Sequence, residues 1–233
     1  MKLSTRSIRY RWHQLIRTKK IQISGVFIST APSDVARRIR KALFNGTYED
    51  QERFFVEKYV KKTSRILEIG CGIGLVSLVA RNICTEGFVI SYEANPQMET
   101  LIRKNYALNN LVPNLEMKAV SIDGKKLEFY IDPEVLSSSL FDRKMSHKKV
   151  IVESDAFDDI LNKIKPDTII MDVEGAEIDL LGSSRLTSVT QMIVEIHPHI
   201  VGDEKILQLN QKLGTLNFKE IERRGKVCVY ARN

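Results

Sequence analysis

Three closely spaced glycines follow a short apolar run in the first third of the chain. Residues 66–78 read ILEIGCGIGLVSL, so that Gly70, Gly72 and Gly74 stand between an apolar run and a helical pattern. Because glycine has no β-carbon, a ligand can lie against such a turn and reach the free N–H groups at the start of the helix. The motif therefore predicts a strand, a turn and a helix that form a nucleotide-type binding crevice.

The spacing of these glycines distinguishes between nucleotides. The dinucleotide fingerprint has its third glycine at the sixth position, where this chain has Leu75. Gly-x-Gly-x-Gly, preceded by Glu68, resembles the first motif of the Rossmann-like S-adenosylmethionine (SAM) methyltransferases, whose ligand carries no pyrophosphate. The alternative is an ordinary strand-to-helix turn that uses glycine for its geometry.

A second acidic residue follows at a characteristic distance. The apolar run at 87–93, GFVISYE, ends in Glu93, which lies 19 residues after Gly74. In a doubly wound sheet, a carboxylate at the end of the second strand can accept hydrogen bonds from both ribose hydroxyls of a nucleotide. We therefore expect Glu93 to bind a ribose, although NAD would need a similar acid; a solvated strand-end glutamate is the alternative.

Composition indicates one globular catalytic domain. The 233 residues are 43% hydrophobic and 28% charged, and their longest apolar runs are strand-sized, so we expect no integral membrane segment. Three scattered cysteines are too few for a disulfide framework or a zinc site. We therefore expect a cytoplasmic protein without a metal site.

The net charge of +7 is concentrated at the N-terminus. Residues 1–41 hold 11 Lys or Arg and a single acid, Asp34. Within them, residues 4–20 mix apolar side chains with arginines at helical spacing, which suits an acidic partner, a membrane surface, nucleic acid, or a helix that packs on the domain or on a second subunit. We assign residues 1–45 to a basic extension of helix, strand and helix.

Alternating apolar runs predict an α/β fold. We expect a strand at 21–30, a helix at 33–43 capped by Ser33, and helical spacing at 48–60. Further strands are predicted at 65–70, 87–92, 115–120, 126–131, 167–172, 190–196, 217–222 and 226–231. Further helices are predicted at 74–83, 96–109, 155–163, 176–182 and 203–214. This order implies a mainly parallel sheet with an antiparallel edge hairpin. The resemblance to the Rossmann-like methyltransferases implies that this sheet has seven strands.

The segment at 168–181, TIIMDVEGAEIDLL, places Asp172 and Glu174 at the end of a buried strand. Ligands of open α/β sheets bind at that edge. Together with GTYE at 46–49, NYALNN at 105–110 and EIHP at 195–198, the segment resembles the FkbM-type methyltransferase family. That family usually has D-x-G-A-N-x-G in its first motif, whereas this chain has EIGCGIG.

The resemblance implies a methyltransferase domain at 46–233, with SAM as methyl donor and a hydroxyl of a sugar, glycan or other small molecule as acceptor. It also suggests that Tyr48 and Glu49 cover the methionine end of SAM, while the adenine lies near Ala94, Asn95, Val120 and Ser121. The full set of expected cofactor-binding residues is Tyr48, Glu49, Glu68, Gly70, Cys71, Gly72, Gly74, Leu75, Glu93, Ala94, Asn95, Val120, Ser121 and Asp172.

Methyl transfer to oxygen needs a proton acceptor near the crevice. His197 is the first candidate, because it follows a predicted strand and imidazole titrates near neutral pH. A histidine fixed in the Pro198 turn by a hydrogen bond is the alternative, and Asp172 and Glu174 compete for the role. The polar insertion between 131 and 167 could form a lid over the acceptor or an ordinary surface loop.

Other functions are disfavoured by missing motifs. The chain has no N/D-P-P-Y/F tetrad after its fourth strand and no cysteine after a proline, so DNA methylation is disfavoured. A metal-dependent catechol-type enzyme stays open, since Asp172 could ligate magnesium, but no downstream Asp-Asn pair completes an oxygen shell. A non-catalytic SAM- or nucleic-acid-binding module and an NAD-linked oxidoreductase are further alternatives, the latter disfavoured by Leu75.

Overall fold

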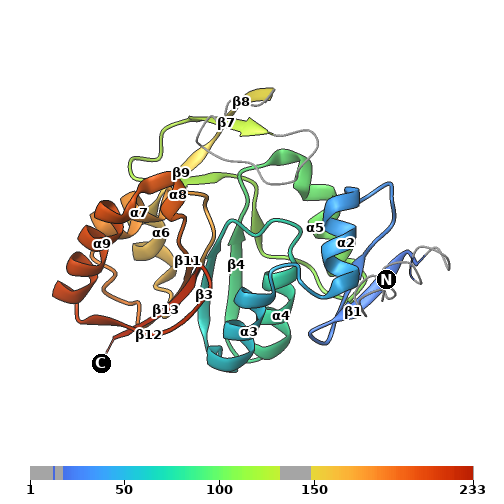
Figure 1. Cartoon of the computed structure of the whole chain (residues 1–233), viewed down its shortest axis with the longest axis horizontal. Coiled ribbons are helices and arrows are strands. Elements are labelled where there is room, and N and C mark those ends of the chain that lie inside the picture. Colours follow the sequence, from blue (N-terminus) through green and yellow to red (C-terminus); the bar gives the residue numbers. More distant parts are fainter. Residues whose placement is uncertain (1–12, 14–17, 132–147, 233) are drawn as a thin grey trace, which may run out of the picture.

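A seven-stranded sheet runs through the centre of the molecule (Figure 1). The computed structural model describes residues 13, 18–131 and 148–232. Within these residues the strands follow one another across the sheet in the order β12-β13-β11-β10-β3-β4-β5. In that order their bounds are Phe218–Arg224, Val227–Arg232, Gln191–Glu195, Thr168–Met171, Arg65–Ile69, Phe88–Tyr92 and Leu115–Glu116.

The strands from β11 to β5 are parallel, whereas β13 runs antiparallel to both β11 and β12. The central strands are short apolar segments, ILEI in β3 and TIIM in β10, and these residues are buried. Such runs are typical of parallel strands whose two faces are both covered by helices. The predicted α/β fold, with a mainly parallel sheet of seven strands and an antiparallel edge hairpin, is confirmed.

The order of the strands reverses at β3. On one side of β3 lie β4 and β5, which follow it in the chain, and on the other side lies β10. Ligands of open α/β sheets bind outside the carboxyl ends of the strands at such a reversal. Gly70 follows β3 and Asp172 follows β10, so two segments that are far apart in the sequence meet at this point.

Helices cover both faces of the sheet (Figure 1). One face carries α3, α4 and α5 with α2 beside them, and the other carries α6, α7 and α9. Among the described residues, none of the helices has the length and apolar character needed to cross a membrane. Their bounds are Arg37–Asn45 for α2, Asp50–Tyr59 for α3, Leu75–Ile83 for α4, Glu99–Ala107 for α5, Phe157–Ile164 for α6, Glu177–Ser183 for α7, Pro198–Val201 for α8 and Asp203–Thr215 for α9, with a 3-10 helix, η1, at Pro96–Met98.

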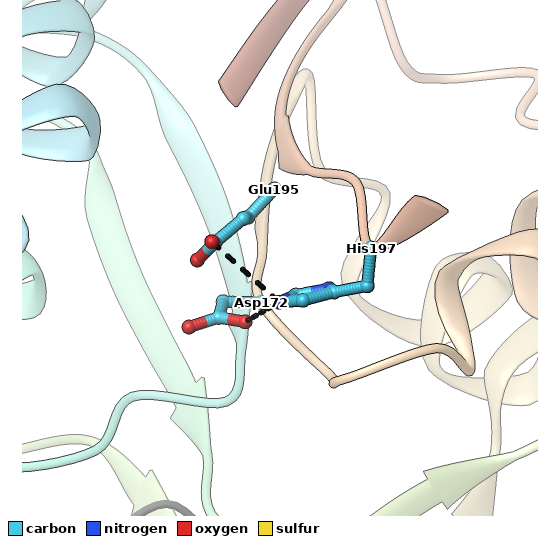
Figure 2. Close-up of side chains that lie close together, drawn as sticks. All are labelled: Asp172, Glu195 and His197. Atoms are coloured by element: carbon cyan, nitrogen blue, oxygen red, sulfur yellow. Dashed lines mark ion pairs between the residues drawn. The ribbon is translucent and has the colours of Figure 1, made fainter. Parts of the chain in front are cut away.

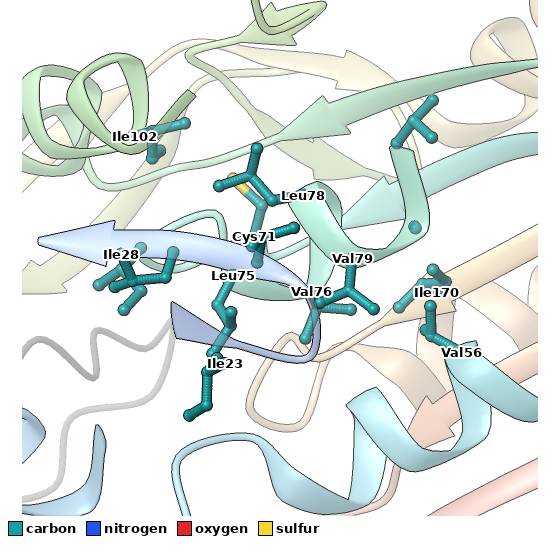
Figure 3. Packing of buried hydrophobic residues seen from close by; sticks show 14 of the residues in the cluster. Ile23, Ile28, Val56, Cys71, Leu75, Val76, Leu78, Val79, Ile102 and Ile170 are labelled. Carbon is teal, nitrogen blue, oxygen red and sulfur yellow. The ribbon is translucent and has the colours of Figure 1, made fainter. Parts of the chain in front are cut away.

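Alternate residues of the strands face two separate hydrophobic cores. Ile66 of β3 and Ile170 of β10 belong to the first core, which Figure 3 shows with Val56 of α3. Leu67 and Ile169, each one position away, belong to the second core. Since side chains alternate across a strand, the sheet is the middle layer of three.

The described part of the N-terminal region packs onto the first core. Residues 20–29 form a hairpin of β1 (Lys20–Ile23) and β2 (Val26–Ser29) rather than the single strand predicted over 21–30. Ser24 and Gly25 both adopt positive φ, as a two-residue hairpin turn requires. Ile23 and Ile28 of the hairpin belong to the same core as α4 (Figure 3), so these residues complete one face of the domain.

Helix α2 begins later than the sequence suggests. Its N-cap residue is Ala36 and not Ser33, whose hydroxyl donates a hydrogen bond to Asp34 instead. The predicted helix at 4–20 and the proposed lid within 132–147 lie largely or wholly outside the described residues. The domain boundary at residue 45 stays a prediction.

The segments predicted as strands at 115–120 and 126–131 are extended, but most of their residues pair outside the main sheet. The predicted strand at 115–120 divides into β5, which joins the main sheet, and β6 (Ala119–Ser121), which pairs with β9 (Ser154–Ala156). The predicted strand at 126–131 is β7 (Leu127–Ile131), which within the described residues pairs with β8 (Lys148–Val152) and no other strand. An apolar pattern indicates that a segment is extended without specifying its neighbour. These two small sheets stand beside the carboxyl edge of the main sheet.

Candidate functional site

A cleft of about 470 Å³ lies at the carboxyl edge of the sheet, over the strand reversal. The residues that line it come from α2, the segment before α3, the ends of β3 and β4, the segments after β3, β4 and β10, β6 with the residue before it, β7, α8 and the turn between β12 and β13. Nine of the predicted site residues line this cleft: Tyr48, Glu49, Gly70, Gly72, Glu93, Ala94, Val120, Asp172 and Glu174.

The glycine turn forms one wall of the cleft and lies directly against the end of β10. A β-carbon at Gly70 would come within 1.8 Å of the carbonyl oxygen of Asp172, and the residue has a φ of +84°. Gly72 also has positive φ, at +54°. Only glycine meets both demands at Gly70, and the turn therefore leaves bare backbone exposed to the cleft.

Tyr48 and Glu49 reach over this turn from the segment before α3. A β-carbon at Gly72 would lie 3.3 Å from Glu49 Oε1 and 3.4 Å from Tyr48 Oη. Glu49 adopts a left-handed conformation with φ of 47°, which costs free energy for a residue other than glycine. The structure thus brings both predicted residues beside the glycine turn.

Glu93 lies at the end of β4, and its carboxylate is tied to the same turn. The N–H of Gly72 donates to its Oε2 at 2.8 Å, and the N–H of Asn95 donates to its Oε1 at 2.8 Å. Burial raises the pKa of Glu93 to about 7, against the opposing effect of these N–H groups. A carboxylate oxygen can accept more than one hydrogen bond, so a hydroxyl donor that reaches Glu93 from the cleft can share its oxygens with these N–H groups.

An apolar wall stands next to Glu93. Ala94, Ala119 and Val120 line the cleft there, together with Phe129 of β7. Phe129 is buried and packs with Ala119 and Ala94. A flat aromatic ligand can be sandwiched by such side chains. Phe129 was not predicted as a site residue, because its sequence position reveals only a strand and not the cleft beside it.

A cluster of ionisable side chains forms the other wall. His197 Nε2 lies 3.3 Å from Glu174 Oε2, 3.5 Å from Glu195 Oε1 and 3.7 Å from Asp172 Oδ1. Figure 2 shows Asp172 after β10 and Glu195 at the end of β11 converging on the imidazole. Burial and then the neighbouring carboxylates, Glu195 first, raise the pKa of Asp172 well above its usual range.

Glu177 holds the other side of the imidazole. Its Oε1 accepts the backbone N–H of His197 at 3.0 Å and lies 3.3 Å from His197 Nδ1, while its Oε2 accepts the N–H of Gly175 at 2.6 Å. Burial lowers the pKa of His197, but the hydrogen bond with Glu177 and the surrounding carboxylates reverse this effect and leave it raised. Glu177 is fully buried and was not predicted as a site residue, since an acid in a first helical turn has an ordinary explanation.

Seven predicted residues do not line the cleft. Glu68 is buried beneath it and accepts hydrogen bonds from the hydroxyls of Ser77 and Ser91. Asn95 accepts the N–H of Gln97 with its side chain. The others are Cys71, Gly74, Leu75, Ser121 and His197, and all five are buried. Their proposed roles stay predictions, but side-chain contact with a ligand would require these residues to move.

Cationic side chains at the cleft were not anticipated. Arg38 of α2, Lys118 and Lys226 line it beside His199, and two of these cations pair with nearby acids. Lys118 Nζ lies 2.8 Å from Asp155 Oδ1, and Lys226 Nζ lies 3.8 Å from Glu195 Oε1. No sequence signal separates these residues from other surface cations, because the fold alone brings them to one place.

Comparison with known proteins places the chain among methyltransferases. A family model described as the methyltransferase FkbM domain matches residues 68–224. Ribosomal protein L11 methyltransferase of Thermotoga neapolitana is 29% identical over 58 residues, which cover 25% of this chain and 22% of that protein.

Solved structures that resemble the chain include methyltransferase FkbM from Methylobacillus flagellatus KT, with 11% identity, a TM-score of 0.47, and coverage of 84% of this chain and 55% of that one. TYW2 from M. jannaschii, in complex with AdoMet, has 13% identity and a TM-score of 0.48, and the match covers 92% of this chain and 86% of that one.

Along the chain, the matched residues run from β3 to β12. They make up more than half of the 233 residues. The match includes the segment at 168–181, which carries part of the resemblance. That resemblance is confirmed, and the chain belongs to the FkbM methyltransferase family.

Proposed function

We propose that the protein transfers a methyl group from SAM to a hydroxyl oxygen of a sugar or other small molecule. One observation carries the proposal: the carboxylate of Glu93 and the bare backbone at Gly70 and Gly72 share one cleft at the strand reversal. The carboxylate of Glu93 can accept hydrogen bonds from a ribose, and the bare backbone leaves room for the amino acid tail of SAM. Membership of a methyltransferase family supports the same reading.

The cofactor would lie along the cleft from Tyr48 to Phe129. Its ribose hydroxyls would donate to Glu93, and its adenine would lie between Val120 and Phe129, which line the apolar part of the cleft. Its methionine end would meet the backbone at Gly72, beneath Glu49. Leu75 in place of a sixth-position glycine supports SAM over NAD.

The acceptor hydroxyl would enter from the acidic side of the cleft. In the reaction its oxygen attacks the methyl carbon, the bond from that carbon to sulfur breaks, and S-adenosylhomocysteine (SAH) leaves. The hydroxyl proton passes to a carboxylate of the Asp172 and Glu174 pair, both of which line the cleft. His197 is only 2% exposed, so we assign it a positioning role behind these carboxylates.

Transfer of label from methyl-labelled SAM to a panel of hydroxylated sugars and lipids tests this function. We expect label in an acid-stable, base-stable methyl ether, and Glu93→Ala should abolish it. Label recovered on nitrogen or carbon would contradict the choice of acceptor. A cytoplasmic location and contacts through the basic N-terminus remain predictions.

A further inference from the structure

We propose that Asp172, Glu195 and His197 bind one divalent metal ion at the acidic wall of the cleft. Their ligand atoms, one from each side chain, all lie within 4.8 Å of one another (Figure 2). This departs from the expectation of no metal site, which rested on the scattered cysteines and on the missing Asp-Asn pair. The donors instead come from the ends of β10 and β11 and the start of α8.

The distances around the imidazole suit coordination better than direct hydrogen bonding. His197 Nε2 lies 3.5 Å from Glu195 Oε1 and 3.7 Å from Asp172 Oδ1. Charge-assisted hydrogen bonds are about 2.7–2.9 Å long, and a single N–H points at one acceptor. Two ligand atoms that each lie about 2.1 Å from a shared ion are separated by roughly 3–4 Å. Glu174 Oε2, at 3.3 Å from the same nitrogen, stands as a further oxygen donor.

The partner of the second ring nitrogen sets the imidazole in a metal-binding form. Glu177 Oε1 lies 3.3 Å from His197 Nδ1, and Glu177 is itself held by the N–H groups of Gly175 and His197. A buried carboxylate in this position keeps the proton on Nδ1 and turns the Nε2 lone pair toward the three acids. Metal-binding histidines typically have such a carboxylate behind them.

An unpartnered oxygen at the centre of the cluster is an independent indication of a ligand. Asp172 Oδ1 is buried, yet it has no hydrogen-bond partner within the part of the chain that the structure describes. A buried polar atom left without a partner costs free energy, which a metal ion at this position would recover. Lys226 Nζ lies 3.8 Å from Glu195 Oε1, which is longer than a hydrogen bond.

The donor set indicates which ion fits. Carboxylates suit Mg²⁺ and Mn²⁺, whereas imidazole suits first-row transition metals, so Mn²⁺ accepts both kinds of ligand. The role of the ion rests on the proposed function. An ion here would bind the acceptor hydroxyl and lower its pKa, so that the oxygen attacks the methyl group more readily.

Titration of the full chain with Mn²⁺ tests the site without any acceptor. Binding is measured as the loss of the EPR signal of free Mn²⁺. We expect one ion per chain for the unmodified protein and for Asp123→Asn, a control at an exposed acid. Glu195→Gln, which keeps the shape of the side chain, and His197→Ala should weaken binding by at least about tenfold, and Glu177→Gln by about 10- to 100-fold.

Two results would overturn the metal site. One is an unchanged free-ion signal with the unmodified protein, and the other is equal binding by the Glu195 and His197 variants. An increase in melting temperature with SAH reports that each variant is folded and is independent of the EPR result. Failure to bind SAH would therefore count against the proposed function alone, and failure to bind Mn²⁺ against the metal site alone.

Discussion

Gly70 lies directly against the carbonyl oxygen of Asp172, which would be 1.8 Å from a β-carbon at position 70. This contact joins the turn after β3 to the end of β10 at the strand reversal. It places the backbone that would receive the methionine end of SAM beside the acids that would receive the acceptor.

Gly70→Ala should therefore destabilise the fold. The side chain would clash with backbone that cannot move freely, and φ of +84° disfavours any residue with a β-carbon. We expect a loss of roughly 3 kcal/mol or more in the free energy of unfolding, measured by chemical denaturation.

Gly182→Ala is the matched control. It lies in α7, and outside its chain neighbours and its own helix backbone no heavy atom of the described residues comes within 4 Å of its β-carbon position. Alanine should leave stability unchanged or raise it by about 0.5–1 kcal/mol. Equal effects of the two substitutions would contradict the contact between Gly70 and Asp172.

Glu68 should make stability fall as the pH rises. Burial raises its pKa from 4.5 to about 7, so the folded chain keeps this proton over a range in which the unfolded chain has lost it. The folded state binds more protons between these values, and stability decreases by up to about 1 kcal/mol per pH unit until it levels off above the folded pKa.

Denaturation of the unmodified protein and of Glu68→Gln across this pH range checks the prediction. The substitution should flatten the decrease, since a glutamine has no proton to lose. If the free energy of unfolding has the same slope against pH in both proteins, the slope comes from other buried acids. Glu52 is one of them, since burial also raises its pKa to about 7.

SAH should bind more tightly above neutral pH than below it. In the proposed complex the ribose hydroxyls would donate to an ionised Glu93, whose pKa burial raises to about 7. Below that value, affinity should fall by up to about tenfold per pH unit, because a proton competes with the ligand. Titration calorimetry of the unmodified protein and Glu93→Gln measures this; a variant with the same pH dependence would exclude Glu93 as the titrating group.

His197→Ala should retain SAH binding and lose methyl transfer to an acceptor found in the labelling screen. The imidazole lies near Asp172 and Glu174 and does not line the cleft, so its loss should alter the acidic wall and leave Glu93 and the glycine turn in place. A change in kcat with an unchanged dissociation constant for SAH is expected. Unchanged turnover would remove His197 from the reaction.

Local sequence patterns were sufficient to predict a feature where it depends on the residues of one segment. The strand, glycine turn and helix at 66–78, the acid at Glu93 and the edge hairpin all follow from neighbouring residues. Phe129 and Lys226 could not be found in this way, because distant strands bring them to the cleft. Glu177 was missed for another reason: its role depends on His197, which is 20 residues away in the chain.

Titration calorimetry of the unmodified protein with SAH and with NAD tests the central claim most directly. The account predicts that SAH binds to one site per chain, that NAD does not bind, and that Glu93→Ala abolishes SAH binding while the variant stays folded. Binding of NAD in place of SAH, or SAH binding unaffected by the loss of Glu93, would contradict it.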